Sequence, residues 1–138
     1  MKTATLKPDQ LDRRQVDALR AAMLERARQL REEIRQTLVK SDSEQYLQIA
    51  HDVRDLEDES FADLIVDVSL AEIDRDLEEL RAIDAALLRV ADGTYGACSV
   101  CERPIEVRRL KAAPHAERCL DCQTLYERTH FTRKGSTL

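Results

Sequence analysis

The chain has 138 residues, of which 36% are charged and 4% are aromatic, with three Gly and no Trp. This composition excludes a β-sandwich or a large mixed core, and it favours long helices with a narrow apolar seam. No stretch reaches the eighteen or more apolar residues of a membrane span, and residues 1–5 lack the apolar run of a secretory signal. We therefore expect a cytoplasmic protein of one domain, or of a domain with an extension, and no membrane partner.

The net charge of −5 is divided unevenly along the chain. Residues 1–40 carry ten Lys or Arg against six Asp or Glu, a balance of +4. Residues 41–92 carry four against sixteen, a balance of −12, and residues 93–138 carry eight against five, a balance of +3. A basic stretch and an acidic stretch attract each other when they lie side by side, so this pattern is a first indication of a helical hairpin.

A long amphipathic helix is predicted from the start of the chain, with Pro8 and Asp9 as its first turn. Its apolar residues fall mostly at steps of three, four or seven: Leu11, Val16, Leu19, Met23, Leu30, Ile34 and Leu38. Residues 39–59 are less regular, because Ser41, Asp42 and Ser43 weaken the helix. Tyr46, Ile49 and Val53 could carry it a few turns further, so its end stays open.

A second periodic run predicts another long helix, which ends at Asp92 and Gly93. Its apolar residues are Phe61, Leu64, Val68, Ile73, Leu77, Leu80, Leu87 and Val90. The expected fold is mainly α: an antiparallel coiled-coil hairpin in residues 1–92, with its tip at about 45–60, and a small zinc module in residues 93–138. A short helix is expected from about Cys119, with a frayed end after Arg133.

The four cysteines of the chain form two Cys-x2-Cys pairs separated by seventeen residues: Cys98, Cys101, Cys119 and Cys122. This spacing is typical of a four-thiolate zinc site. Four sulfurs surround one Zn²⁺ at about 2.3 Å and leave no open position for water or substrate. We therefore predict one structural zinc ion, and cysteines spaced for a metal favour the reducing cytoplasm.

No motif of an enzyme is present: the sequence has no nucleotide fingerprint, no phosphate-binding glycine loop and no His-Glu-x-x-His. His51, His115 and His130 are separated in sequence, and surface positions are expected for all three. A function other than catalysis is predicted.

The zinc segment carries a specific set of residues: Tyr95-Gly96-Ala97-Cys98-Ser99-Val100-Cys101, Ile105, Arg108-Arg109-Leu110, Ala112, Pro114 and Cys119-Leu120-Asp121-Cys122-Gln123. This set resembles the DksA/TraR family of bacterial transcription regulators, closely over residues 93–125 and in layout over the preceding hairpin. The resemblance implies a zinc-bearing end and a coiled-coil finger. It also implies a partner, RNA polymerase, whose secondary channel the finger enters, and no sequence-specific DNA binding. A monomer is expected.

The resemblance also implies an acidic tip with the pattern Asp-x-x-Asp-x-Ala. The matching residues here are Asp55, Asp58 and Ser60, so Ser replaces the family's Ala. Carboxylates at the end of a rod suit a channel that leads to a Mg²⁺-containing centre. The same residues could instead cap the second helix. The segment before Asp55 is also several residues longer than in the best-known members.

Other positions depart from the family. Members that hold the alarmone (p)ppGpp against the polymerase use basic residues where this chain has Ala82, Ala113 and Gln123. Because none of these side chains is positively charged, co-operation with (p)ppGpp is not expected in the same form. Arg75 and Arg109 keep matching positions, and either contact the polymerase or pair with carboxylates of the hairpin. Glu102 stands where such knuckles often have Gly.

Two other functions compete with a polymerase-binding regulator. A zinc-ribbon nucleic-acid binder would use Arg103, Arg108, Arg109, Lys111 and Arg118, and its binding would weaken steeply with salt. A thiol-based redox sensor would release zinc when its thiolates are oxidised. The balance of −12 in residues 41–92 disfavours nucleic-acid binding. A redox sensor is disfavoured because nothing in the sequence indicates that any of the cysteines is unusually reactive.

Overall fold

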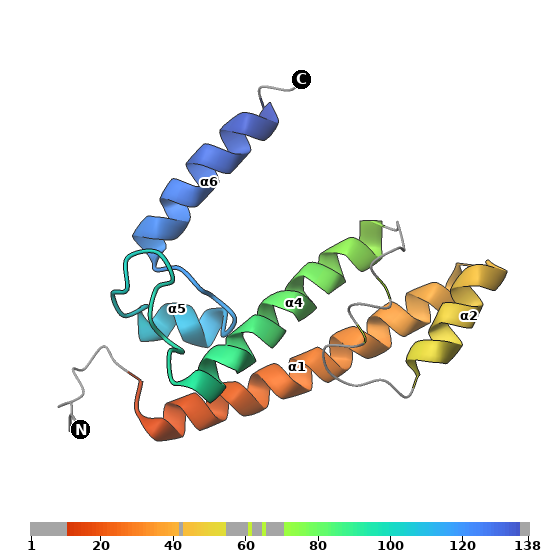
Figure 1. Ribbon diagram of the computed structural model, residues 1–138, viewed down its shortest axis with the longest axis horizontal. Helices are drawn as coiled ribbons and strands as arrows, with labels where there is room; N and C mark the ends of the chain where they lie inside the picture. Colours follow the sequence, from red (N-terminus) through yellow and green to blue (C-terminus); the bar gives the residue numbers. More distant parts are fainter. Residues whose placement is uncertain (1–10, 42, 55–60, 62–64, 66–70, 136–138) are drawn as a thin grey trace.

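The computed structural model describes residues 11–41, 43–54, 61, 65 and 71–135. Its helices are α1 (Arg13–Lys40), α2 (Glu44–Val53), α4 (Ala71–Asp92), α5 (Val107–Ala112) and α6 (Leu120–Gly135). Helices α1 and α4 lie side by side and antiparallel, and α2 lies against the far end of α1 (Figure 1). In the described residues the only β-type pairing is an isolated bridge between Ala97 and Pro104. The fold is therefore mainly α, built on a helical hairpin, as predicted.

Helix α1 begins later than the sequence suggested. Asp12 is its N-cap: the Asp12 side chain accepts from the Gln15 backbone N–H at 2.8 Å, and the Gln15 side chain accepts from the Asp12 backbone N–H at 2.9 Å. This reciprocal capping box satisfies two backbone donors that a helix start leaves unpaired. Pro8 and Asp9 lie outside the described residues, and a helix running on from them through Leu11 is wrong because the Asp12 backbone is extended.

The uncertain end of the first helix is a break between two helices. Helix α1 stops at Lys40, and the Ser41 hydroxyl donates to the Leu38 carbonyl at 2.6 Å. Ser43 then caps α2, because its hydroxyl accepts from the Tyr46 backbone N–H at 3.4 Å. Ser competes for backbone hydrogen bonds in this way, which explains why the Ser-rich segment ends one helix and starts another.

The predicted stop at Gly93 is confirmed, and its geometry is a Schellman motif. Gly93 has φ +84°, its N–H donates to the Val90 carbonyl at 3.4 Å, and the Thr94 N–H donates to the Arg89 carbonyl at 2.9 Å. Only a residue that accepts positive φ without strain closes a helix this way at low cost. The Asp92 carboxylate accepts from the Thr94 N–H at 3.0 Å, and together these bonds direct the chain into the zinc segment.

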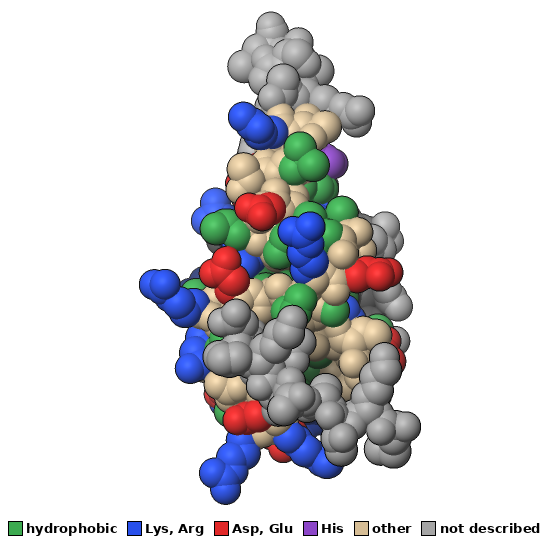
Figure 2. Space-filling model, turned by 90° about the vertical axis from the view of Figure 1, so that its left-hand side faces the viewer, with side chains coloured by type: hydrophobic (Ala, Val, Ile, Leu, Met, Phe, Trp, Pro, Cys, Tyr) green, Lys and Arg blue, Asp and Glu red, His purple; other side chains and the backbone are tan. Residues whose placement is uncertain are grey.

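Helix α6 was expected from the sequence, whereas the short helix α5 was not. Helix α6 projects away from the hairpin (Figure 1), and Figure 2 shows hydrophobic side chains exposed along its described part. Leu120, Leu125 and Tyr126 are 54%, 62% and 38% exposed. The six residues of α5 carry only one buried side chain, Leu110, so no apolar periodicity marks this helix in the sequence.

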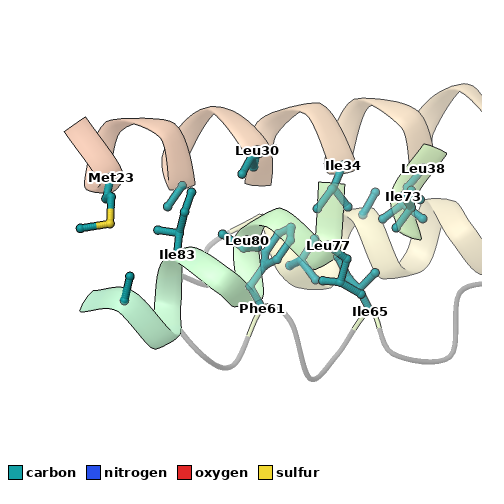
Figure 3. Packing of buried hydrophobic residues seen from close by; sticks show 14 residues of the cluster. Met23, Leu30, Ile34, Leu38, Phe61, Ile65, Ile73, Leu77, Leu80 and Ile83 are labelled. Carbon is teal, nitrogen blue, oxygen red and sulfur yellow. The ribbon is translucent and has the colours of Figure 1, made fainter. Parts of the chain in front are cut away.

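The main core lies along the seam between α1 and α4. Figure 3 shows that Met23, Leu30, Ile34 and Leu38 meet α4 residues that run in the opposite order, from Ile83 to Ile73. Phe61 and Ile65 cover this seam from a third side and are 1% and 0% exposed. A buried side chain of this size contributes about 1.5–3 kcal/mol relative to an exposed one, so the seam holds the hairpin together.

The sequence identified most of this core. The predicted residues found buried in it are Met23, Leu30, Ile34, Leu38, Val53, Phe61, Ile73, Leu77 and Leu80. Leu19 is also buried, but in a second cluster beside the zinc segment. Leu87 and Val90 pack at its edge, and Leu64 and Val68 lie outside the described residues. Ala27, Ala50, Ile65, Ile83 and Ala86 were missed although they are at most 3% exposed. Among the described residues no helix is both long and apolar enough to cross a bilayer.

Candidate metal centre

The first cysteine pair lies on a tight knuckle. Ala97 pairs with Pro104, the Cys98 N–H donates to the Arg103 carbonyl at 2.8 Å, and the Ile105 N–H donates to the Gly96 carbonyl at 2.7 Å. These bonds fold residues 98–103 into a loop that turns Cys98 and Cys101 to the same side. The Val100 N–H donates to the Cys98 sulfur at 3.4 Å, as expected where backbone donors surround a thiolate.

The second pair stands at the start of α6. Cys119 directly precedes the helix and Cys122 lies in its first turn, where the Cys122 N–H donates to the Cys119 sulfur at 3.5 Å. The two pairs are joined by a bond from the Ser99 N–H to the Glu117 carbonyl at 2.8 Å. Loop and helix N-terminus therefore present four thiols to one point.

A small second core supports these thiols. Cys98 is 2% exposed and packs with Ile105, Leu110 and Leu19 of α1. Tyr95 is half-buried beside them, and its hydroxyl donates to the Pro114 carbonyl at 2.8 Å. Burial raises the pKa of Tyr95 to about 12, so this hydroxyl keeps its proton and the bond persists at neutral pH. The zinc segment is thereby attached to the first turns of α1.

The arrangement of the sulfurs fits zinc. The four Sγ atoms all lie within 4.8 Å of one another, and those of Cys101 and Cys119 are 3.7 Å apart. A tetrahedron with zinc–sulfur bonds of about 2.3 Å has edges of about 3.8 Å. All four cysteines are free of disulfides. The predicted ligand set Cys98, Cys101, Cys119 and Cys122 is thus brought together in the geometry that one zinc ion requires.

The electrostatics of the four-cysteine cluster also favour a bound cation. Burial opposes ionisation of Cys98, but backbone N–H donors from Cys101, Cys119 and Val100 outweigh it and lower its pKa to about 6. In contrast, the hydrogen bond with Cys119, and then burial, raise the pKa of Cys122 to about 12. Four thiolates this close repel one another, and a divalent ion at their centre stabilises all four.

Glu102 occupies the turn after the second ligand in a conformation that favours glycine. Its φ is +65°, the only positive φ of a non-glycine residue among the described residues. Its N–H still donates to the Cys98 carbonyl at 3.0 Å, so the knuckle keeps its shape. The substitution noted in the sequence therefore leaves the metal site intact, at a cost of roughly 1–2 kcal/mol in local backbone energy.

A basic cavity of about 310 Å³ lies between α4 and the zinc segment. Its wall includes all three positions where the resemblance leads one to expect basic residues, namely Ala82, Ala113 and Gln123. Other arginines line it instead, with His115 and Glu117 beside them: Arg89, Arg118 and the predicted Arg109. Arg118 was named only in the nucleic-acid-binding alternative, and Arg89 stands in an unremarkable sequence context, so only the folding of α4 against this segment reveals the cluster.

Two details of this cavity concern its cations. One terminal nitrogen of Arg89 is buried and has no hydrogen-bond partner within the described part of the chain. The Arg109 Nε donates to the Arg118 carbonyl at 2.9 Å, which ties α5 to the second knuckle. His115 is half-buried here, so the expectation of a plain surface position holds only partly for this residue.

The other predicted site residues are not gathered with this centre. Arg75 is exposed near the start of α4, at the end of this helix that lies away from the zinc segment. Asp55, Asp58 and Ser60 lie outside the described residues, so both their role as a tip and the alternative that they cap the second helix stay predictions.

Together, the helical hairpin and the four-cysteine centre define a C4 zinc-finger protein with a coiled-coil arm. The family model described as "Prokaryotic dksA/traR C4-type zinc finger" matches residues 93–128. The chain is 30% identical to the DnaK suppressor protein of Agrobacterium tumefaciens C58, whose solution structure aligns with a TM-score of 0.55 over 86% of this chain and 97% of that one. This chain belongs to the DksA/TraR family.

Two further relatives extend the comparison. The transcription factor DksA2 from Pseudomonas aeruginosa has the same fold, with a TM-score of 0.59 over 91% of this chain and 93% of that one, at 23% identity. The "RNA polymerase-binding transcription factor DksA" of Escherichia coli K12 is 32% identical over 99 residues. That alignment spans 72% of this chain but only 62% of the longer relative.

Proposed function

We propose that this protein binds RNA polymerase directly and regulates transcription, without being an enzyme. The observation that carries the proposal is the joint presence of the four-cysteine centre and the antiparallel hairpin in a chain that is 32% identical over 99 residues to a relative named as an RNA polymerase-binding transcription factor. In this proposal zinc is structural: it fixes residues 95–122 against α1 and so sets the direction of the hairpin. The protein acts in the cytoplasm, as a monomer, and needs no specific DNA sequence.

The finer proposal concerns how the finger acts. The hairpin enters the secondary channel and brings Asp55 and Asp58 near the catalytic centre, where their carboxylates act on a Mg²⁺-containing site. Support comes from the sequence pattern, in which Asp55 and Asp58 match the two aspartates of the family's tip motif; both lie outside the described residues. Arg75 and Arg109 would contact an acidic polymerase surface. The division into an arm (1–92) and a zinc module (93–138) belongs to the same proposal.

Capture by purified polymerase tests the proposal that the protein binds RNA polymerase directly. Zinc-loaded protein should co-purify with RNA polymerase core enzyme and change the yield of transcripts in a purified system. An absence of both binding and effect would refute it. The Asp55→Asn/Asp58→Asn variant should bind normally and lose most of its effect on transcription, whereas Asp74→Asn/Glu78→Gln, a matched change of two exposed α4 carboxylates, should retain it.

Arginine variants test the proposed contacts. Arg75→Gln should weaken capture, and Arg81→Gln, an exposed arginine of the same helix, serves as its control. Arg109 also bonds the Arg118 carbonyl, so Arg109→Gln needs a zinc measurement beside it to separate contact from loss of the module. Equal capture by the Arg75 and Arg81 variants would remove Arg75 from the interface.

Dependence on (p)ppGpp is expected to differ from that of members with basic residues at positions 82, 113 and 123. The cavity wall is apolar or neutral at all three positions, and its cations come from other places, Arg89 and Arg118 among them. We expect polymerase to bind the protein equally with and without (p)ppGpp. If (p)ppGpp strongly enhanced polymerase binding and Arg89→Gln abolished that enhancement, the arginines of this cavity would have replaced the basic residues that other members have at positions 82, 113 and 123.

A nucleic-acid-binding function is disfavoured by the surface. In Figure 2, Lys and Arg side chains at the zinc end are interspersed with Asp and Glu, and no continuous basic stripe of the kind that follows a phosphate backbone appears on this face. A gel shift at several salt concentrations provides the control: binding that falls steeply with salt would favour the nucleic-acid alternative.

A further inference from the structure

A groove lies on the hairpin, far along α1 from the zinc centre, with a volume of about 230 Å³. Four of its lining residues are arginines, Arg28, Arg31 and Arg35 from α1 and Arg54 from the end of α2, and Glu32 is the one acidic residue of the lining. Arginines rarely gather on one short stretch without anionic partners, because like charges at helical spacing repel. The groove plays no part in the zinc site or in the function proposed above.

Two of the arginines are held in place. Arg28 donates to Glu25 through Nε at 3.1 Å and through Nη2 at 2.6 Å. Arg35 makes the same two-pronged pair with Glu32. Each pair uses Nε and Nη2 and leaves the Nη1 donors for another acceptor. A guanidinium fixed in this way loses less side-chain entropy when it binds a carboxylate.

The other two arginines have no partner within the described residues. Arg31 and Arg54 make no ion pair or hydrogen bond with any described residue, although Arg31 is only partly exposed. Among the described residues, Arg31 and Arg54 remain once Glu25 and Glu32 are counted against Arg28 and Arg35. Guanidinium groups in excess at one place favour an anionic partner there.

The spacing indicates the kind of partner. Arg28, Arg31 and Arg35 stand at i, i+3 and i+7, so they share one face of α1 over roughly 10.5 Å. Carboxylates at i, i+3 and i+7 of a second helix have the same repeat. We propose that this groove is a docking surface for an acidic helical segment of a partner protein, whose carboxylates pair with these arginines and with Arg54.

A nucleic acid fits less well. Polyanion binding depends on many phosphate contacts and on a broad basic surface. Here Glu25 and Glu32 stand within the cluster, and residues 41–92, which include Arg54, carry a balance of −12. A discrete set of carboxylates can avoid these glutamates, whereas a continuous phosphate backbone cannot.

Binding of a synthetic peptide tests the proposal without polymerase, so its failure leaves the proposed function untouched. The probe is an alanine-rich helical peptide of about 20 residues with Glu at i, i+3 and i+7, and its counterpart has Gln at those positions. Fluorescence anisotropy with the full zinc-loaded chain at low salt should detect the Glu peptide and not the Gln peptide. Raised salt should weaken the binding, because these pairs are partly exposed.

Matched double variants locate the binding. Arg31→Gln/Arg54→Gln should weaken binding of the Glu peptide about five- to tenfold, since each exposed pair contributes up to about 1 kcal/mol. Arg14→Gln/Arg20→Gln removes the same charge from exposed positions of α1 outside the groove and should change it less than about twofold. Circular dichroism melting shows whether each variant is folded.

Three outcomes would overturn the proposal. The first is equal binding of the Glu and Gln peptides, or binding of neither. The second is equal weakening by both double variants, which would indicate a diffuse charge effect. The third is tighter binding of a single-stranded oligonucleotide that depends on Arg31 and Arg54, which would make the groove a nucleic-acid site.

Discussion

Arg26 of α1 and Glu79 of α4 form a two-pronged ion pair across the hairpin. The Arg26 Nε lies 2.6 Å from one Glu79 oxygen, and its Nη2 lies 3.0 Å from the other. The pair joins the basic first segment of the chain to its acidic second segment, as the charge division predicted. It lies beside the seam of the core, with side chains 40% and 30% exposed, so solvent screens it only in part.

Removing this pair should cost stability in a pH-dependent way. The hydrogen bond from Arg26 lowers the pKa of Glu79 below its usual value of 4.5. A lowered pKa contributes stability above pH 4.5, and this contribution is lost as the pH falls through the folded-state pKa. Glu79→Gln should therefore lose up to about 1 kcal/mol at pH 7 and very little at pH 3, in urea unfolding.

Glu78→Gln is the control for this prediction, because Glu78 is exposed on the same helix. Asp76, next to the pair, has the opposite behaviour: burial raises its pKa, so its ionisation weakens the fold at neutral pH and protonation relieves this cost. Because Glu79 is one of the charges that raise the pKa of Asp76, Glu79→Gln also relieves part of this cost. A Glu79→Gln deficit that stays constant from pH 7 to pH 3 would contradict the ion-pair explanation.

The seam should respond strongly to truncation. Leu30 is fully buried between α1 and α4, and Leu30→Ala should reduce the free energy of unfolding by about 2–5 kcal/mol. Leu88 is on α4 and 57% exposed, so Leu88→Ala should change it by less than about 0.5 kcal/mol. Similar losses for both variants in urea titrations would show that the seam is not the main core.

Glycine at position 102 should stabilise the zinc segment. Glu102 has φ +65° and an exposed side chain, so Glu102→Gly removes backbone strain without removing a packed group. We expect a gain of up to about 1 kcal/mol, measured by thermal unfolding with zinc present. Ser99→Gly, an exposed change in the same knuckle at ordinary φ, should give no gain, and equal shifts for the two would argue against strain at position 102.

Loss of zinc should affect the two cores differently. Cys98→Ser removes one ligand from the buried position beside Leu19 and Ile105, and the purified protein should contain much less than one zinc per chain. The larger core between α1 and α4 contains none of the cysteines, so most of the far-ultraviolet helix signal should remain. Ser99→Ala, next to the ligand, should keep its zinc. A complete loss of helix signal in Cys98→Ser would mean that the hairpin depends on the metal.

Local information in the sequence determined the elements that follow a simple repeat. The spacing of Leu30, Ile34 and Leu38 predicted α1, Gly93 predicted the end of α4, and two Cys-x2-Cys pairs predicted a single metal centre. In each case the physical reason is short in range: a helix places every third or fourth residue on one face, glycine accepts positive φ, and a knuckle needs two thiols three residues apart.

The tertiary structure decided what depends on distant segments meeting. The break between α1 and α2 arises because Ser41 and Ser43 bond to backbone groups, a competition whose outcome depends on how α2 packs against α1. The basic cavity with Arg89 and the groove with Arg31 each combine residues from separate helices. Because no periodic signal records which charged side chains become neighbours across elements, such surfaces emerge only when the chain is folded.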